Sequence, residues 1–189
     1  MCDSPDDLVA LVSAHPSQSW LYRGLIKRLR EELAKLQVEV NEEKSRNVEL
    51  TNGESFAFLG FEIRRIRTRA GKWRPHSMPS RKARKALLAK LKVEFQSRES
   101  QPVSRVIDKI NPILRGWVTY FAVGHSSRCF SYVRDWVEKK VRRQMLKARK
   151  RPGFGWKRWS KGLIYGELGL FDGYKLRPRQ SSPKALPAR

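Results

Sequence analysis

Residues 110–150 read INPILRGWVTYFAVGHSSRCFSYVRDWVEKKVRRQMLKARK and carry the clearest helical pattern of the chain. Asn111 followed by Pro112 predicts a helix start, because Asn is a favoured N-cap and Pro at the first helical position loses no hydrogen bond. Apolar residues then recur every three or four positions until Gly124, which predicts one buried helix face ending at that glycine. The apolar positions of this helix are Ile113, Leu114, Trp117, Val118 and Phe121.

A second helix is expected to follow Ser126 or Ser127, since either serine can serve as its N-cap. Its spacing predicts a buried stripe at Phe130, Val133, Val137, Val141 and Leu146. The remaining faces are predicted to be basic and are opposed only by Asp135 and Glu138. These basic positions are Arg128, Arg134, Lys139, Lys140, Arg142, Arg143, Lys147, Arg149 and Lys150. A helix with this surface is expected to attract phosphate.

The residues of both helices resemble the maturase-specific domain, also called the X or thumb domain, of group II intron reverse transcriptases. The resemblance rests on residues 111–117, on Tyr120 and Phe121, and on the aromatic and basic helix that follows. It implies a thumb-like helical bundle that binds structured intron RNA, with Arg115 of the first helix among the RNA contacts.

The composition also indicates a nucleic-acid partner. The 189 residues include 41 Lys and Arg against 18 Asp and Glu, which gives a formal net charge of +23. Such an excess repels itself unless a polyanion is bound, so we expect RNA rather than an anionic membrane surface. The hydrophobic content of 40% suffices for one or two small folded domains.

Several other classes of protein are not expected. No apolar run approaches the ~20 residues that span a bilayer, and residues 1–7 do not read as a signal peptide, so we expect a cytoplasmic protein. Cys2 and Cys129 are too few and too far apart for a zinc site and are expected to be reduced thiols.

Asp6 and Asp7 precede the apolar run at residues 8–12, as in a tight hairpin that presents carboxylates at a sheet edge. They resemble the second half of the Tyr-Ala-Asp-Asp motif of reverse transcriptases, with Ser4 and Pro5 in place of Tyr and Ala. The resemblance implies a remnant of the catalytic pair, because the fingers and the other metal-binding acids would lie before residue 1. We therefore expect no cofactor for this chain. The parent family uses Mg²⁺, and Asp6 would bind it only if a separate chain completed the site.

Residues 19–78 fit the end of a reverse-transcriptase palm in the same order. An amphipathic helix at residues 21–36 precedes residues 41–45, which resemble an Asn-x-x-Lys-Thr element in which Lys44 contacts phosphate or is simply solvated. Residues 56–63 form a strand-like segment that Gly60 allows to bulge. By resemblance this segment places Arg64 and Arg65 near a primer end, although it also fits a plain core strand. Residues 64–74 read as a basic hairpin.

A helical bundle is expected over residues 79–174. Ser80 caps a helix whose inward residues are Ala83, Leu87, Leu88, Leu91 and Phe95, and a short helix at residues 103–110 follows it. Residues 168–171 are expected to dock back on the bundle, and residues 175–189 to be a disordered basic tail. The predicted fold class is therefore α+β, with a small partial palm at residues 1–78 and an all-α thumb-like bundle at residues 79–174.

Residues 154–159 alternate aromatic and cationic side chains, a pattern typical of contacts with unpaired bases and phosphates. A core role for Trp156 and Trp159 is the alternative. The complete predicted RNA-binding set is Lys44, Arg64, Arg65, Arg115, Arg142, Arg143, Lys147, Arg149, Trp156, Lys157, Arg158 and Trp159.

Our hypothesis from the sequence is a maturase-type fragment that binds intron RNA and assists group II intron splicing without a catalytic residue of its own. One alternative is a polymerase that acts on a DNA/RNA hybrid when a separate fingers and palm chain completes it. Another is a truncated remnant without function.

Overall fold

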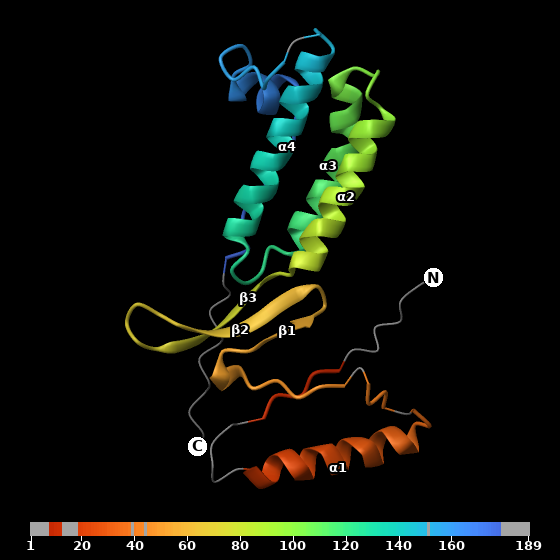
Figure 1. The fold of residues 1–189 in the computed structure, drawn as a ribbon, viewed down its shortest axis with the longest axis vertical. Coiled ribbons are helices and arrows are strands. Elements are labelled where there is room, and N and C mark those ends of the chain that lie inside the picture. The colour runs from red at the N-terminus through yellow and green to blue at the C-terminus, as the bar shows by residue number, and fades with distance from the viewer. Residues whose placement is uncertain (1–7, 13–18, 39, 44, 151, 179–189) are drawn as a thin grey trace, which may run out of the picture. The chain divides into compact units, whose positions relative to one another are not determined.

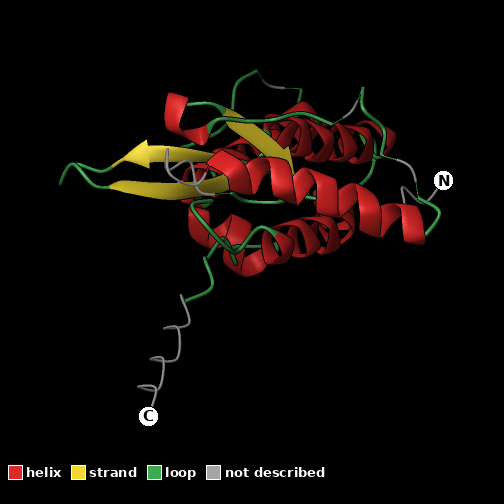
Figure 2. Cartoon of the chain, turned by 90° about the horizontal axis from the view of Figure 1, so that it is seen from below, coloured by secondary structure: helices red, strands yellow, loops and turns green. Residues whose placement is uncertain are grey.

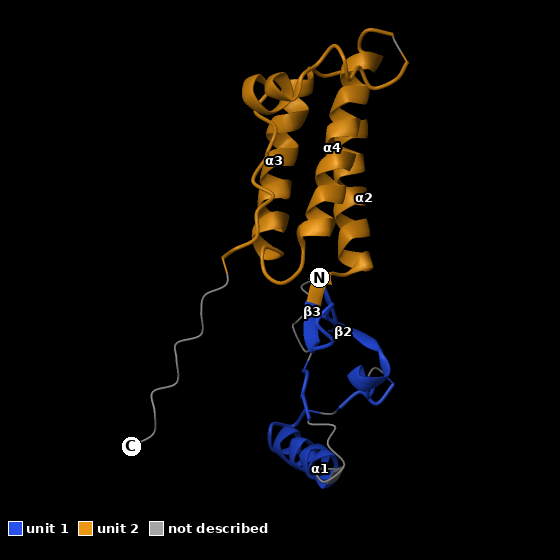
Figure 3. Cartoon of the chain, turned by 90° about the vertical axis from the view of Figure 1, so that its left-hand side faces the viewer, with its two compact units in different colours: residues 1–76 blue, residues 77–189 orange. Residues whose placement is uncertain are grey.

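A computed structural model describes residues 8–12, 19–38, 40–43, 45–150 and 152–178 (Figure 1). The chain divides into two compact units, residues 1–76 and residues 77–189, hereafter unit 1 and unit 2 (Figure 3). A three-stranded sheet of order β1-β2-β3 precedes the helices of unit 2, which confirms the α+β prediction (Figure 2). None of the described helices is both long and apolar enough to cross a membrane.

Unit 1 contains one long helix and a tight hairpin. The helix α1 spans Ser19–Lys35, as its leucine spacing predicts, and the short 3-10 turn η2 spans Leu50–Asn52. Strand β1 (Ser55–Phe58) pairs antiparallel with β2 (Phe61–Arg67). Leu59 and Gly60 between them have φ of 47° and 77°, so they form a two-residue turn whose twist suits a hairpin. The bulge predicted at Gly60 is thus a hairpin turn.

The second hairpin joins β2 to β3 (Trp73–Pro79) and confirms the prediction of a basic hairpin. Its turn is closed by hydrogen bonds from Thr68 N to Lys72 O at 2.8 Å and from Gly71 N to Thr68 O at 2.9 Å. Near this turn the Arg65 guanidinium lies 5.0 Å from the ring centre of Trp73.

Unit 2 contains three long helices that pack side by side around one core (Figure 1). They are α2 (Arg81–Ser97), α3 (Val103–Tyr120) and α4 (Ser127–Lys147), and the short π-helix η3 (Gly162–Glu167) follows them. Ser80 caps α2 as predicted, since its Oγ accepts a hydrogen bond from Ala83 N at 3.1 Å. The helical residues of the core are Leu87, Leu91, Phe95, Val106, Ile107, Ile110, Leu114, Val133, Val137 and Val141.

The predicted helix start at Asn111 is wrong, because α3 runs through Pro112 as a single helix. Proline inside a helix removes a hydrogen bond and costs ~3 kcal/mol or more. The apolar period continues unbroken across Pro112, however, and the stripe is buried at Ile110, Leu114 and Val118 and partly buried at Ile113 and Trp117, which offsets this cost. Asn111 has a different role: its Nδ2 donates to Gly169 O at 2.8 Å, and its Oδ1 accepts from Phe171 N at 2.9 Å.

The segment after η3 docks on the bundle, as predicted for residues 168–171. Ile164 and Leu170 are buried in the core, and Asn111 holds the intervening backbone. Of the expected tail, residues 175–178 are described, and Arg177 N donates to Ala122 O at 2.8 Å. Residues 179–189 lie outside the described residues, so their disorder stays a prediction.

The connection from α3 to α4 requires a glycine. Gly124 has φ of +73°, and a Cβ built on it would lie 2.7 Å from the carbonyl oxygen of Ser77. His125 N donates to that same oxygen at 2.7 Å. The start of unit 2 is therefore fastened to the turn before α4, and Ser126, buried, occupies the N-cap position of that helix.

Candidate nucleic-acid interface

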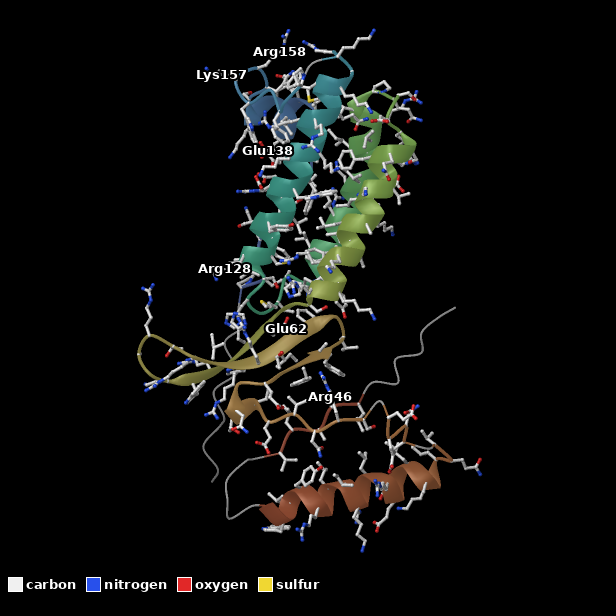
Figure 4. All side chains as sticks on the ribbon, in the orientation of Figure 1. Arg46, Glu62, Arg128, Glu138, Lys157 and Arg158 are labelled. Carbon is white, nitrogen blue, oxygen red and sulfur yellow. The ribbon has the colours of Figure 1, made fainter. Side chains whose placement is uncertain are left out.

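Positive charge is concentrated on two of the three long helices of unit 2. The helix α2 carries six basic residues and one acidic residue, and α4 carries seven basic and two acidic residues. The helix α3 carries only three basic residues and one acidic residue. Figure 4 shows Arg128 at one end of α4 and Lys157 and Arg158 beyond its other end. Cationic groups therefore extend along the whole of α4.

Aromatic rings and cations alternate on one side of α4. The Arg84 guanidinium of α2 lies 4.7 Å from the ring centre of Tyr132, and the Lys140 amine lies 5.3 Å from that of Trp136. Tyr132, Trp136 and Lys140 are four residues apart in turn, a spacing that places them on one face of the helix. Sequence reasoning placed Lys140 on the basic surface of this helix but missed Arg84 and these two rings as binding candidates, although the four-residue spacing was a usable signal for the rings.

Arg142 is buried, so the prediction that it lies on an exposed face is wrong. Its side chain is 2% exposed, and its Nε and Nη2 donate to Glu138 Oε1 at 3.0 and 2.8 Å. Its Nη1 donates to the backbone oxygen of Trp159 at 2.6 Å. Burial of this charge is tolerated because a carboxylate and a carbonyl oxygen occupy its donors. Arg142 therefore fastens residue 159 to α4 instead of facing a ligand.

Glu138 accepts a third hydrogen bond, from the Tyr165 hydroxyl to its Oε2 at 3.1 Å. Burial, and then the neighbouring Glu138 carboxylate, raise the pKa of Tyr165 above its ordinary value. The phenol therefore stays protonated and remains a donor at neutral pH. The buried Glu138 and Arg142 and the partly buried Tyr165, hereafter the buried triad, thus join α4 to η3 and to the segment before it.

The loop at residues 154–159 is held on this triad. The ring of Trp156 lies over Arg142, with 4.3 Å between the guanidinium carbon and the ring centre, while the side chain remains 48% exposed. Trp159 is 4% exposed, which confirms the core alternative for this residue. Gly155 has φ of +61°, and a Cβ there would lie 2.6 Å from Cε3 of Trp159. The loop is thereby pressed against Trp159, and Trp156 is left on the surface.

Two open grooves flank this loop at the C-terminal end of α4. The first, hereafter the Phe154 groove, has a volume of about 340 Å³ and is lined by Arg143, Lys147, Lys150, Pro152, Gly153 and Phe154. The second, hereafter the Trp156 groove, has a volume of about 560 Å³ and is lined by Leu146, Arg149, Gly155, Trp156, Lys157 and Arg158. Both grooves combine one aromatic ring with three cationic side chains.

Most of the predicted RNA-binding residues meet at this end of α4. Arg143 lies 5.0 Å from the ring centre of Phe154, Arg149 lies 5.6 Å from that of Trp159, and Lys147 forms an ion pair with Glu99. The structure brings together eight of the predicted residues, namely Arg142, Arg143, Lys147, Arg149, Trp156, Lys157, Arg158 and Trp159. Arg142 and Trp159 are the buried supports of this group, and the other six line the grooves.

The remaining predicted residues lie elsewhere. Arg64 and Arg65 belong to β2 of unit 1, and Arg115 is exposed on α3. The predicted positions Asp6, Asp7 and Lys44 lie outside the described residues. Within the described ranges, no group of three or more His, Cys, Asp or Glu side chains is placed to hold a metal ion.

One comparison with known proteins identifies the region that contains these features. Residues 84–162 match the family model described as group II intron, maturase-specific domain. The match begins within α2 and extends through α3, α4 and the loop at residues 154–159 to the first residue of η3. A search of curated proteins gives no significant match.

Proposed function

Because residues 84–162 match the model of the group II intron maturase-specific domain, we propose that this chain binds structured intron RNA and thereby assists splicing. The match to the maturase domain is the observation that carries this proposal. The basic faces of α2 and α4 and the two grooves supply the physical support, since phosphate is the ligand that such surfaces prefer.

In this proposal the RNA performs the splicing chemistry and the protein supplies binding energy. A protein that binds the active RNA fold, and not its alternatives, stabilises that fold by a free energy that grows with the logarithm of the free protein concentration. The gain is about 2.7 kcal/mol when the free protein is at 100 times its dissociation constant. Phosphates brought together by RNA folding repel one another, and the side chains on α2 and α4 would neutralise that repulsion.

We also propose that unit 1 derives from the palm of an RNA-directed DNA polymerase. The tight hairpin of β1 and β2 supports this, because its turn at Leu59 and Gly60 lies within residues 56–63, the segment that by resemblance lies near a primer end. Asp6 would then bind Mg²⁺ only beside acids from a separate fingers and palm chain. DNA synthesis by a mixture of the two chains, abolished by Asp6→Asn, would support the alternative of a polymerase completed by a separate chain, and an inactive mixture would count against that alternative.

The central experiment compares the purified chain on a folded group II intron RNA and on an unrelated structured RNA of equal length. Affinities are measured over a range of salt, and splicing of a precursor RNA is timed with and without protein. Both affinities should fall by about 10³ to 10⁵ between 50 and 200 mM salt if some 6–10 phosphates are neutralised. A preference for the intron RNA that persists at high salt, together with faster splicing, is expected.

A matched pair of charge variants locates the interface. Lys140→Gln removes a cation from the aromatic side of α4, whereas Lys109→Gln makes the same change in net charge on α3. Lys140→Gln should reduce the slope of log affinity against log salt by about one, and Lys109→Gln should leave it unchanged. Coinciding curves for the two RNAs at every salt concentration would remove intron recognition as a function.

A further inference from the structure

The Trp156 groove has features that general phosphate binding does not require. We propose that it is a subsite for one unpaired RNA nucleotide, whose base stacks on the outer face of Trp156 while its phosphate contacts the cationic rim. This inference rests on the proposed function, because it names the part of a structured RNA that this site recognises.

The indole of Trp156 is exposed on one face and supported on the other. Its inner face lies on the Arg142 guanidinium, which is itself fixed by Glu138 and by the backbone of Trp159. Gly155 and the buried ring of Trp159 fix the loop on either side of it. Little conformational freedom remains to be lost when a ligand stacks on the outer face, and this pre-organisation favours binding.

The chemistry of the lining selects a nucleotide over other ligands. Leu146 and Trp156 supply the apolar surface of the groove, and Arg149, Lys157 and Arg158 supply three positive charges. The Arg142 cation beneath the indole draws electron density away from its outer face. The outer face therefore attracts a second cation less strongly, and a neutral ring is the favoured stacking partner. A planar base joined to an anionic phosphate satisfies both parts of the groove.

The same features exclude a regular duplex as the occupant. The bases of an A-form helix are stacked on one another, so only a nucleotide from a loop, bulge or end can place its base on a protein ring. The Phe154 groove lies next along the loop, with 6.1 Å between the ring centres of Phe154 and Trp156. Its rim of Arg143, Lys147 and Lys150 would hold the phosphate of the neighbouring nucleotide.

The test uses two RNA hairpins that differ in one base. Both carry a single-nucleotide bulge, and in one of them that nucleotide is abasic, so the number of phosphates is the same. Stacking of a base on an aromatic side chain contributes about 1–3 kcal/mol, which corresponds to a loss of about 5- to 150-fold in affinity for the abasic hairpin. The wild-type chain should show this loss.

Trp156→Leu keeps an apolar cover over Arg142 but removes the aromatic face, so this variant should bind both hairpins with the affinity that the wild type has for the abasic one. Trp156→Phe restores a ring and should restore part of the difference. Trp20→Leu replaces an exposed tryptophan of α1, 68% exposed, and should behave as the wild type. Fluorescence of 2-aminopurine in the bulge should be quenched by the wild type, by Trp20→Leu and by Trp156→Phe, and should stay unquenched with Trp156→Leu.

Two results separate this inference from the proposed function. Equal binding of both hairpins by the wild type, together with a retained preference for intron RNA, would overturn the nucleotide subsite and leave the maturase function standing. Equal affinity of the wild type for the intron RNA and the unrelated RNA, together with tighter binding of the hairpin that has the base and dependence of that difference on Trp156, would retain the subsite and overturn intron recognition.

Discussion

Replacement of Arg142 by alanine should destabilise unit 2 more than removal of any other positive charge from α4. Arg142 is 1% exposed and Glu138 is 6% exposed, so their ion pair is almost fully removed from water. Removing one partner of such a pair costs about 3–5 kcal/mol, because the other charge is left buried without compensation. In Arg142→Ala, Glu138 would retain only the Tyr165 hydroxyl, and the Trp159 carbonyl oxygen would lose its donor.

The assay is urea denaturation of the purified chain, with the free energy of unfolding obtained by linear extrapolation. A loss of 3 kcal/mol should also lower the melting temperature by at least about 12 °C, since 1 kcal/mol shifts a domain of ~100 residues by about 4–8 °C. Arg143→Ala is the matched control, because it removes the same charge from the adjacent, exposed position. Its free energy of unfolding should change by less than about 1 kcal/mol.

A double-mutant cycle tests the reason for the effect. Glu138→Gln removes the buried negative charge and keeps an acceptor for Tyr165. If Arg142→Ala destabilises by stranding that charge, the double variant should be more stable than Arg142→Ala alone by about 1–3 kcal/mol. The reasoning is refuted if Arg142→Ala costs no more than Arg143→Ala, or if Glu138→Gln fails to relieve it.

Two further predictions concern the phenols of unit 2 and the turn before α4. Burial raises the pKa of both Tyr165 and Tyr174. The nearby Glu138 raises the pKa of Tyr165 further, and Tyr165 raises that of Tyr174. On unfolding they ionise near the ordinary value of ~10, so the free energy of unfolding should fall above pH ~10 by about 1.4 kcal/mol per pH unit for each phenol. Urea denaturation of Tyr165→Phe should show a shallower decline, and an unchanged slope would contradict the assignment. Gly124→Ala should cost at least about 1–2 kcal/mol, because φ there is +73° and the new Cβ meets Ser77 O. Gly116→Ala, within α3 and with open space around its Cβ, should instead be neutral or stabilising by up to about 1 kcal/mol, and equal effects of the two changes would refute the steric argument.

The buried faces of the helices could be predicted because each follows from local spacing. Phe130, Val133, Val137 and Val141 recur at helical intervals, and all four are buried. The error at Pro112 arose from giving a local start signal more weight than this same period. The apolar stripe continues from Val106 to Val118 without a break, and the gain from burying it exceeds the cost of one proline.

The buried triad could not be predicted in this way. Glu138 and Arg142 are four residues apart on one helix, a spacing that usually gives a solvated surface pair of small energetic value. What covers them is Trp156, the backbone of Trp159 and the Tyr165 hydroxyl, all of which come from the chain beyond the end of α4. No periodicity in the sequence indicates that this segment folds back over Arg142.

The folded unit extends beyond the region that matches the maturase family. The match ends at residue 162, yet Ile164 and Leu170 are fully or almost fully buried in the core, and Tyr165 completes the hydrogen bonding of Glu138. Burial of two such side chains contributes about 3–6 kcal/mol, which is comparable to the whole stability of a small domain. Because the same segment keeps the buried triad covered, the exposed ring of Trp156 depends on residues that the family match does not include. The surface proposed to bind RNA at the end of α4 is therefore a property of the whole of unit 2, and variants in η3 are as relevant to testing that proposal as those on α4 itself.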